Sequence, residues 1–388
     1  MKHYYYHCLL ILSFLIFSCS DKQHGDLPVI PVDVVNNIVS QLPLTEIAET
    51  IKAIELELTD ESVIDLRRIH RIILCDNLVF IAQEANILVF EEDGSFVRSI
   101  GSKGQGPGEY IRCHNIAVDE TNKRLFVNAF SKIICYDFLG NVLMESSFSQ
   151  LNGWKTIKDI NYFNNELLLI LRSMDQEDEK GVFSQVELFR LNDNFIIVDS
   201  CTILKHYEER SGFSEDLLQD YILISDSTVY LYYPFSTALP PILISSGRVK
   251  QQKSFLRDTL YRFENNKLIP ELKIKFKNDG IDAEGYMFIN ISHVYRSSRY
   301  IFAKYYNYRQ GLYDNEHYYS YVFCYDTKTK KGYRVLMDRY TDDFNQIEHI
   351  LFHPFHTNPE MFYYWYTHLK PDDREEPNPT IYIGRLKK

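Results

Sequence analysis

Leu78-Val79-Phe80-Ile81-Ala82 and Arg124-Leu125-Phe126-Val127-Asn128 are two similar apolar stretches that lie 46 residues apart. The same shift pairs Gly94 with Gly140 without a gap. Each unit contains short segments of alternating hydrophobicity separated by turn residues, a pattern that is typical of antiparallel strands and not of helix. Repeats of about this length are typical of β-propellers, in which each unit is one small sheet.

The rest of the chain continues this pattern with more variation. Four further units are outlined by strand-like segments within residues 167–203, 221–263, 300–337 and 361–386. The last unit has only two such segments, so its sheet needs a partner strand. Residues 51–58 alternate from Ile54 onward, and we expect them to pair into the last sheet and close the ring. The sequence thus predicts an all-β fold, a six-bladed β-propeller over residues 46–388 that is closed by an N-terminal strand.

Residues 100–110, Ile-Gly-Ser-Lys-Gly-Gln-Gly-Pro-Gly-Glu-Tyr, lie between the first two units. This segment resembles the inter-blade signature of NHL repeats. Together with Asp93-Gly94 and Asp258-Thr259-Leu260-Tyr261, it makes the chain similar to a group of exported six-bladed β-propeller lipoproteins from Gram-negative anaerobes. The resemblance implies an NHL-like fold and a cell-envelope address. For most of that group, membership implies no biochemical activity.

The glycines of this segment have a structural and a functional interpretation. We interpret Gly101, Gly104, Gly106 and Gly108 as blade-crossover glycines, which allow a positive φ or a close backbone approach. A nucleotide-binding loop is the alternative. It is disfavoured because neither Gly-Lys-Ser/Thr nor a helical pattern follows.

The N-terminus predicts export and a lipid anchor. Lys2 precedes the apolar residues 8–17, which are too few to span a bilayer and match the core of a signal peptide. Ile16-Phe17-Ser18-Cys19 is similar to a bacterial lipobox, with Cys19 as the acylated residue. We expect a lipoprotein signal peptide over residues 1–18 and a tether over residues 19–45. The alternative is a secretory signal with an incidental cysteine.

The net charge and the cysteine content exclude some classes of binding partner and a disulfide-based fold. The net charge of −11 argues against nucleic acid and against anionic lipid surfaces beyond the anchor. Five cysteines remain after Cys8 and Cys19, at irregular spacing that is no disulfide framework. We expect a monomeric outer-membrane lipoprotein that contacts the membrane through its anchor only. Exposure at the cell surface and exposure to the periplasm both stay open.

Histidines give the main chemical hypothesis. His70, His114, His293 and His353 each precede a strand Phe by nine to twelve residues, which places each near the start of an innermost strand lining the axial channel. Converging imidazoles could bind Zn²⁺. The favoured alternative is ordinary structural histidines. We interpret two further clusters as plain loops: residues 349–356, which contain three histidines, and the acidic residues 175–180. For the acidic residues, weak Ca²⁺ binding is the alternative.

Two classes of function follow. The favoured one is a non-catalytic binding or scaffold propeller without a cofactor, whose ligand, a glycan, a peptide or an envelope protein, sits at a channel mouth. Exposed tyrosines at a rim could stack on sugar rings. The alternative is a propeller lyase or hydrolase that uses a metal, Zn or Ca, or carboxylates at that mouth. No catalytic residue is assigned, because the sequence marks out neither an acid–base pair nor a nucleophile elbow.

Overall fold

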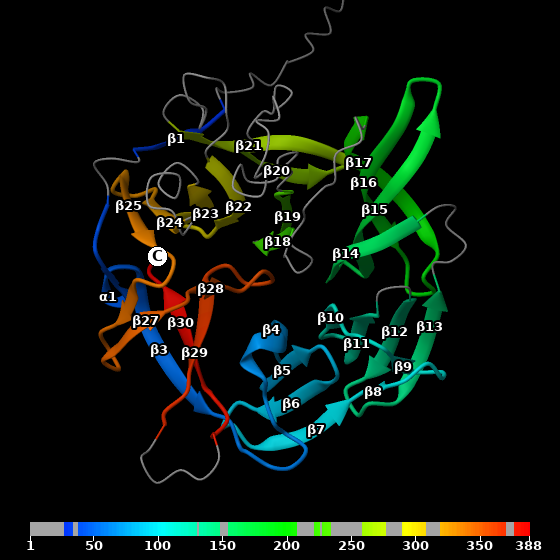
Figure 1. Ribbon diagram of the computed structural model, residues 1–388, viewed down its shortest axis with the longest axis horizontal. Coiled ribbons are helices and arrows are strands. Elements are labelled where there is room, and N and C mark those ends of the chain that lie inside the picture. The colour runs from blue at the N-terminus through cyan, green and yellow to red at the C-terminus, as the bar shows by residue number, and fades with distance from the viewer. Residues whose placement is uncertain are drawn as a thin grey trace, which may run out of the picture.

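The chain folds into a ring of β-sheets that are arranged around a common centre (Figure 1). The computed structural model describes residues 27–33, 38–129, 132–147, 154–207, 221–225, 227–233, 258–276, 289–307, 319–369 and 376–388. The prediction of an all-β propeller is confirmed. The helical elements of the described residues are the single turns α1 (Leu44–Ile47) and η1 (Leu66–Arg68). Within those residues, no helix has the length and apolar content needed to cross a membrane.

The first three sheets each consist of four consecutive antiparallel strands. The first contains β4 (Ile69–Cys75), β5 (Leu78–Gln83), β6 (Ile87–Glu91) and β7 (Phe96–Ile100). The second contains β10 (Asn115–Asp119), β11 (Arg124–Asn128), β12 (Lys132–Asp137) and β13 (Val142–Ser147). The third contains β14 (Trp154–Phe163), β15 (Glu166–Asp178), β16 (Gly181–Leu191) and β17 (Ile197–Tyr207). Between the first two, β8 (Ser102–Lys103) pairs with β9 (Glu109–Tyr110).

The later sheets include strands from the N-terminal segment. The fourth contains β18 (Ile222–Ser225), β19 (Thr228–Leu231), β20 (Thr259–Glu264), β21 (Lys267–Phe276) and β1 (Val29–Val32). The fifth contains β22 (Ile289–Arg296), β23 (Tyr300–Asn307), β24 (Tyr319–Asp326) and β25 (Lys331–Leu336). A small sheet contains β2 (Leu42–Pro43), β26 (Tyr340–Asp342) and β27 (Ile347–Ile350). The last contains β28 (His353–Pro354), β29 (Met361–Tyr366), β30 (Thr380–Leu386) and β3 (Ala48–Glu55).

The blade count differs from the sequence prediction. Counting every sheet with three or more strands as a blade gives seven blades among the described residues, so the predicted number of six is wrong. The missed blade is the small sheet of β2, β26 and β27. Its strands have two to four residues, too few to show a two-residue alternation, and one of them comes from the far end of the chain. The spacing of the repeats therefore could not predict this small sheet.

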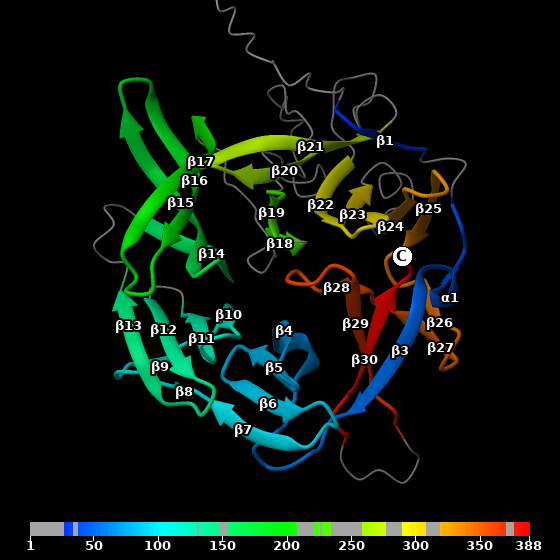
Figure 2. The same cartoon turned by 180° about the vertical axis from the view of Figure 1, so that it is seen from behind.

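The N-terminal segment follows the outer edges of several sheets. β1 pairs in parallel with β21, Ile38 bridges to Arg334 in β25, and β2 pairs with β26. β3 then pairs antiparallel with β30, beside which it lies in both views (Figure 2). Added strands cover backbone groups that an open sheet edge would expose. That the β3–β30 pairing is what holds the ring closed stays a prediction.

Apolar clusters fill the spaces between neighbouring sheets. The repeat residue Phe80 packs in the cluster between the first and second sheets, and Phe126 packs in the cluster between the second and third. Each sheet thus buries both faces against its neighbours, which a lone four-stranded sheet cannot do. This packing directs the first strand of each unit toward the centre of the ring, and the candidate site lies on those inner strands (Figure 1).

Candidate functional site at the start of the inner strands

The inner strands of the first three sheets, β4, β10 and β14, place ionisable side chains at equivalent positions. Each strand forms a hairpin with the next one, and the last paired residues before the three turns are Cys75, Asp119 and Phe163. The residue five positions earlier is His70 in the first sheet, His114 in the second and Lys158 in the third. We call these three residues the His–Lys layer. The next residue along each strand forms a second set, Arg71, Asn115 and Asp159, which we call the Arg–Asp layer.

The Arg–Asp layer is buried and holds the three inner strands together. Arg71 Nη2 donates a hydrogen bond to Asp159 Oδ1 at 2.7 Å. Arg71 Nη1 donates to the backbone carbonyls of Ile116 at 2.8 Å and Ile160 at 2.7 Å. Asn115 Nδ2 donates to the same Asp159 oxygen at 3.1 Å. One guanidinium therefore bonds to β10 and β14 while it projects from β4.

Asp159 extends this network to the fourth sheet. Its Oδ2 accepts hydrogen bonds from the backbone N–H groups of Tyr221 at 2.9 Å and Ile222 at 3.0 Å, at the start of β18. Its Oδ1 also accepts from the N–H of Ile160 at 2.7 Å. A buried carboxylate is tolerated when a cation and several donors surround it, as they do here. The network thus fixes the inner strands of four sheets relative to one another.

β-Bulges set the direction of two side chains in the His–Lys layer. The pairing register of β4 with β5 shifts around His70, and that of β14 with β15 shifts around Lys158, so each is the extra residue of a bulge. Bulges re-aim a side chain and are frequent next to functional sites. β22 has the same irregularity around Ser292. The two bulges thus take the side chains of His70 and Lys158 out of the regular alternation between the two faces of the sheet. Each residue directly precedes one member of the buried Arg71–Asp159 ion pair.

His70 has a defined tautomer. Its Nδ1 lies 2.6 Å from the carbonyl oxygen of Cys113, in the segment that enters β10. A carbonyl can only accept, so Nδ1 carries the proton and Nε2 keeps its lone pair. Burial lowers the pKa of His70 below its ordinary value, which keeps the ring neutral at pH 7. Nε2 is therefore available as a hydrogen-bond acceptor or as a base.

His114 is neutral as well. Its backbone N–H donates to the carbonyl of Asn128 at 2.8 Å, which fixes the residue at the entrance to β10. Burial, reinforced by His70, Arg112 and Lys158 nearby, lowers the pKa of its imidazole to about 4. His70 and Lys158 thus lie near enough to His114 to contribute to the low pKa of its imidazole. The His–Lys layer combines two neutral imidazoles with one ammonium group.

Charged side chains surround this neighbourhood. Glu84, in the turn between β5 and β6, accepts from Arg112 Nε at 2.8 Å and lies 3.6 Å from Arg68 Nη1. Arg68 also pairs with Asp65 at 3.2 Å. The carbonyl of Glu84 accepts from the N–H of Cys113 at 2.9 Å, so the turn is attached to the segment that supplies His114.

The glycine segment carries the chain from β7 to β10 and thus positions His114. Gly101 and Gly108 have positive φ angles of 78° and 70°, whereas Gly104 and Gly106 lie outside that region. The N–H of Gly106 donates to the Glu109 carboxylate at 2.9 Å, and the N–H of Gly104 donates to the carbonyl of Tyr110 at 3.0 Å. The crossover role of the four glycines stays a prediction, and the backbone angles make Gly101 and Gly108 its critical members.

The four predicted histidines do not come together. His70 and His114 are neighbours, but His293 lies on β22 and stacks on Tyr295 with ring centroids 5.7 Å apart. His353 begins β28, and its ring stacks on those of Tyr363 and Trp365. Across the described ranges, no group of three or more His, Cys, Asp or Glu side chains is arranged to hold a metal ion. Among the described residues the four-histidine zinc site therefore has no support, and His293 and His353 instead stack on aromatic rings of their own sheets.

Other sequence interpretations need correction or lie elsewhere. The segments interpreted as loops are partly strands: His349 belongs to β27, and the acidic residues up to Asp178 belong to β15. Gln176–Asp178 pair with β16, and Ile347 and Ile350, on either side of His349, pair with β26. Cys19 lies outside the described residues.

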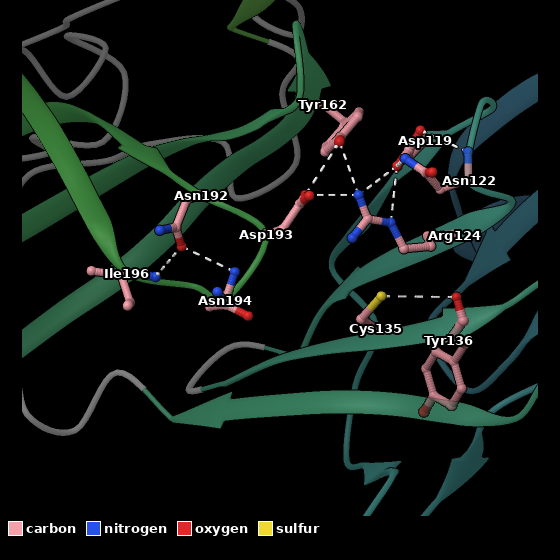
Figure 3. Close-up of polar contacts among 10 residues, drawn as sticks. All are labelled: Asp119, Asn122, Arg124, Cys135, Tyr136, Tyr162, Asn192, Asp193, Asn194 and Ile196. Atoms are coloured by element: carbon pink, nitrogen blue, oxygen red, sulfur yellow. Dashed lines mark hydrogen bonds and ion pairs between the residues drawn. The ribbon is translucent and has the colours of Figure 1, made fainter.

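A second polar network joins the second and third sheets at the opposite ends of the inner strands (Figure 3). Arg124 donates to Asp119 at 2.6 Å, to Asp193 at 2.7 Å and to the hydroxyl oxygen of Tyr162 at 2.9 Å. Its guanidinium also lies over the rings of Phe126 and Tyr162. One guanidinium thus joins two carboxylates that come from different sheets, so we interpret this network as a structural link between the second and third sheets.

Sequence reasoning found His70 and His114 but missed Lys158, Arg71 and Asp159. The missed signal was turn length. The turn Asp76-Asn77 has two residues, both with positive φ, and so does Asn164-Asn165, whereas the equivalent turn of the second sheet has four. Alignment of the units on these turns, instead of on the apolar strands that follow, places Lys158 beside His70.

The chain is similar to one protein family and to several solved structures. The family model described as Domain of unknown function (DUF4934) matches residues 27–380. A candidate exported protein from Bacteroides fragilis, known from its crystal structure, is similar over 93% of this chain and 100% of its own, with a TM-score of 0.60 and 17% identity. The WD40 domain of Neurospora crassa Pan2 is similar over 82% of this chain and 76% of its own, with a TM-score of 0.41 and 11% identity. No curated protein sequence matches the chain.

Proposed function

We propose a function for this chain from the premise that it belongs to the DUF4934 family, whose model spans nearly all of it. The chain is an exported, envelope-anchored β-propeller without catalytic activity, and it binds a ligand at the His–Lys layer. The ligand is a glycan, a peptide or a part of an envelope protein. The binding end is the end of the ring centre at which β4, β10 and β14 begin.

The observation that carries this proposal is the equivalence of His70, His114 and Lys158. Three adjacent sheets present a polar side chain at the same position of the inner strand, directly before a buried network that spans four sheets. A binding site needs side chains that are held in place by a rigid second layer. The bulges at His70 and Lys158 are a second indication, because bulges that redirect a side chain are frequent next to functional sites.

The proposed location in the cell envelope is based on the lipobox-like motif that ends at Cys19. With Cys19 acylated, nine residues lie between the anchor and Val29, the first residue of β1, which makes ten steps along the chain. An extended chain of that length reaches at most about 35 Å. The propeller would therefore stay close to the membrane, tethered from the outer edge of its fourth sheet. The likeness to NHL repeats, a single propeller domain and a monomeric state belong to the same proposal. That domain takes in more than residues 46–388, because β1 and β2, from the segment predicted as a tether over residues 19–45, pair into propeller sheets.

Binding at this layer can be tested by NMR on the purified chain from residue 20 onward. Imidazole signals of His70 and His114 are assigned by their loss in His70→Gln and His114→Gln, and libraries of oligosaccharides and peptides are then screened. We expect at least one ligand that shifts both signals and binds more weakly to each variant. The exposed His349 supplies the matched control, since His349→Gln should bind as the wild type does. Ligands that bind without moving either signal would overturn the proposal.

One observation favours the catalytic alternative. His70 offers a neutral Nε2 with a fixed tautomer, as a general base does, and Lys158 lies in the same neighbourhood. A lyase or hydrolase would then convert, and not only bind, the ligand found in the screen. Product formation by the wild type that His70→Gln abolishes would support the enzyme. Unchanged ligand after prolonged incubation would support the binding protein.

A further inference from the structure

The ring centre is filled directly below the His–Lys layer. Arg71, Asn115 and Asp159, from the inner strands of the first three sheets, are 1%, 6% and 0% exposed. Asn128 Nδ2 donates a hydrogen bond to Asn115 Oδ1 at 3.0 Å and is buried with them. Polar side chains along an open, water-filled channel would be exposed to solvent, whereas these are buried and bonded to one another. The Arg–Asp layer therefore closes the ring centre beneath His70, which is partly exposed itself.

A turn of the last sheet closes the ring centre a second time, at the end opposite the His–Lys layer. The turns that follow the inner strands lie at that end, and they have two residues in the first and third sheets. In the last sheet the turn is longer and comprises residues 355–361. The carbonyl of His356 accepts from the N–H of Ile224 in β18 at 2.7 Å, so this turn reaches the inner strand of the fourth sheet. β28 and β18 accordingly lie close together near the ring centre in Figure 1 and Figure 2.

We infer that the His–Lys layer binds the terminal sugar residue of a glycan and not an internal part of the chain. This inference rests on the proposed function and specifies the ligand. Within the described residues, the Arg–Asp layer and the turn of residues 355–361 leave the ring centre one entrance, at the His–Lys end. A polymer cannot pass through a ring that is closed in this way. The part of a glycan that descends to His70 is therefore its end.

The hydrogen-bonding capacity of His70 favours a sugar hydroxyl over the end of a peptide. Its Nδ1 proton is bound by the Cys113 carbonyl, so Nε2 accepts a hydrogen bond and cannot donate one. A C-terminal carboxylate also only accepts, so it finds no partner there. An N-terminal ammonium needs a counter-charge in a partly buried place, and the nearby carboxylates of Glu84 and Asp65 both pair with arginines. A hydroxyl group donates to Nε2 and needs no counter-charge.

The wild-type chain can be tested with ligands that differ in the presence of a chain end. Methyl glycosides of glucose, galactose, mannose, N-acetylglucosamine and fucose serve as isolated terminal residues. We expect at least one of them to shift the imidazole signals of His70 and His114. A linear oligosaccharide that ends in the same sugar should bind with similar affinity, and one without that end should bind at least about tenfold more weakly. For glucose, maltohexaose and cyclomaltohexaose form this pair, and for the other sugars the end is capped by a different sugar.

One substitution separates ligand binding by His70 from its structural role. In His70→Asn, the shorter amide can donate to the Cys113 carbonyl in place of Nδ1, but the acceptor at the position of Nε2 is lost. We expect about tenfold weaker binding of the methyl glycoside and a urea midpoint close to that of the wild type. His349→Asn, at an exposed histidine of β27, is the matched control and should bind as the wild type does.

Closure of the ring centre can be measured without a ligand. A soluble gadolinium chelate broadens the NMR signals of groups that solvent reaches. It should broaden the imidazole signals of His70 and leave the side-chain amide signals of Asn115 sharp, because Asn115 is 6% exposed. Equal broadening of both would show an open ring centre and would overturn the inference.

The remaining outcomes separate this inference from the proposed function. Equal affinity for ligands with and without the end, or wild-type affinity in His70→Asn, overturns recognition of a terminal sugar while binding at the layer stands. The same holds if none of the five methyl glycosides moves either signal, or if only a glycine–serine tetrapeptide does. The library screen described above then decides the proposed function by itself.

Discussion

Arg71 and Asp159 form an ion pair of 2.7 Å between the first and third sheets, and their side chains are 1% and 0% exposed. The pair passes over the inner strand of the second sheet, to which Arg71 also donates through the carbonyl of Ile116. One contact therefore couples three inner strands, and the backbone bonds of Asp159 at Tyr221 and Ile222 include a fourth. Because His70 and Lys158 directly precede the two members of the pair, the geometry of the candidate site depends on it.

Removal of one partner should destabilise the fold strongly. Asp159→Ala leaves the Arg71 guanidinium buried without a counter-charge, and we expect a loss of about 3–5 kcal/mol in the free energy of unfolding by urea. The matched control is the exposed pair of Lys52 and Glu92, at 2.9 Å with side chains 57% and 46% exposed. Lys52→Ala should cost no more than about 1 kcal/mol. A loss in Asp159→Ala as small as that of the control would show that the pair is not structural.

The closing role of β3 can be tested within one strand. Ile54 is buried against the sheet, and the preceding Ala53 is exposed. Ile54→Asp places a carboxylate in an apolar cluster and should cost more than about 3 kcal/mol, whereas Ala53→Asp should be near neutral. Deletion of residues 51–58 should produce aggregation, because it opens an edge of the last sheet. A soluble deletion variant with an unchanged melting midpoint would contradict the closure model.

The glycine segment offers its own control. Gly108 has a φ of 70°, and an added Cβ would meet a methyl group of Val142, so Gly108→Ala should cost about 1–3 kcal/mol in urea unfolding. Gly106 lacks a positive φ, and its nearest neighbour is the flexible Glu109 carboxylate at 3.1 Å. Gly106→Ala should therefore cost less than Gly108→Ala. Tight binding of ATP or NAD by the wild type, lost in Gly108→Ala, would overturn the structural interpretation.

Stability should fall as the pH decreases below neutrality. The pKa of His114 is about 4 in the folded chain against an ordinary value of 6.5, so between these values the unfolded chain binds a proton that the folded chain does not. Unfolding then takes up a proton, and the free energy of unfolding decreases toward low pH. His114→Gln should reduce this decrease between about pH 7 and about pH 4.5, and His349→Gln should retain it. Equal pH dependence in both variants would show that His114 does not contribute.

The anchor is tested in cells. Cys19→Ala should abolish acylation and release the protein from the membrane fraction, since the anchor is the only membrane contact that we expect. Uptake of labelled fatty acid and fractionation measure the two effects. Absence of label from the wild type, together with membrane association of the variant, would contradict the lipobox interpretation.

Part of the candidate site was accessible from the sequence. His70 and His114 come 10 and 12 residues before Phe80 and Phe126, which occupy equivalent positions in two repeat units. Counting along the chain was therefore enough to place both histidines at the start of inner strands. The same counting grouped His293 and His353 with them as metal ligands, but no such group of three or more forms among the described residues, and both rings stack on aromatic neighbours. Spacing along the sequence determines the position of a residue along its strand. It does not determine how far residues of different sheets lie from one another, or which aromatic rings a side chain packs against.

The sequence by itself determined the all-β architecture, because two-residue alternation and turn residues are local properties of each strand. Only the tertiary structure decided that Lys158 joins His70 and His114, that Arg71 pairs with Asp159, and that a small sheet forms from β2, β26 and β27. These features depend on contacts between residues far apart in the chain, and on bulges and turn lengths that shift register by one or two positions. Such shifts are small in the sequence, but they decide which side chains meet.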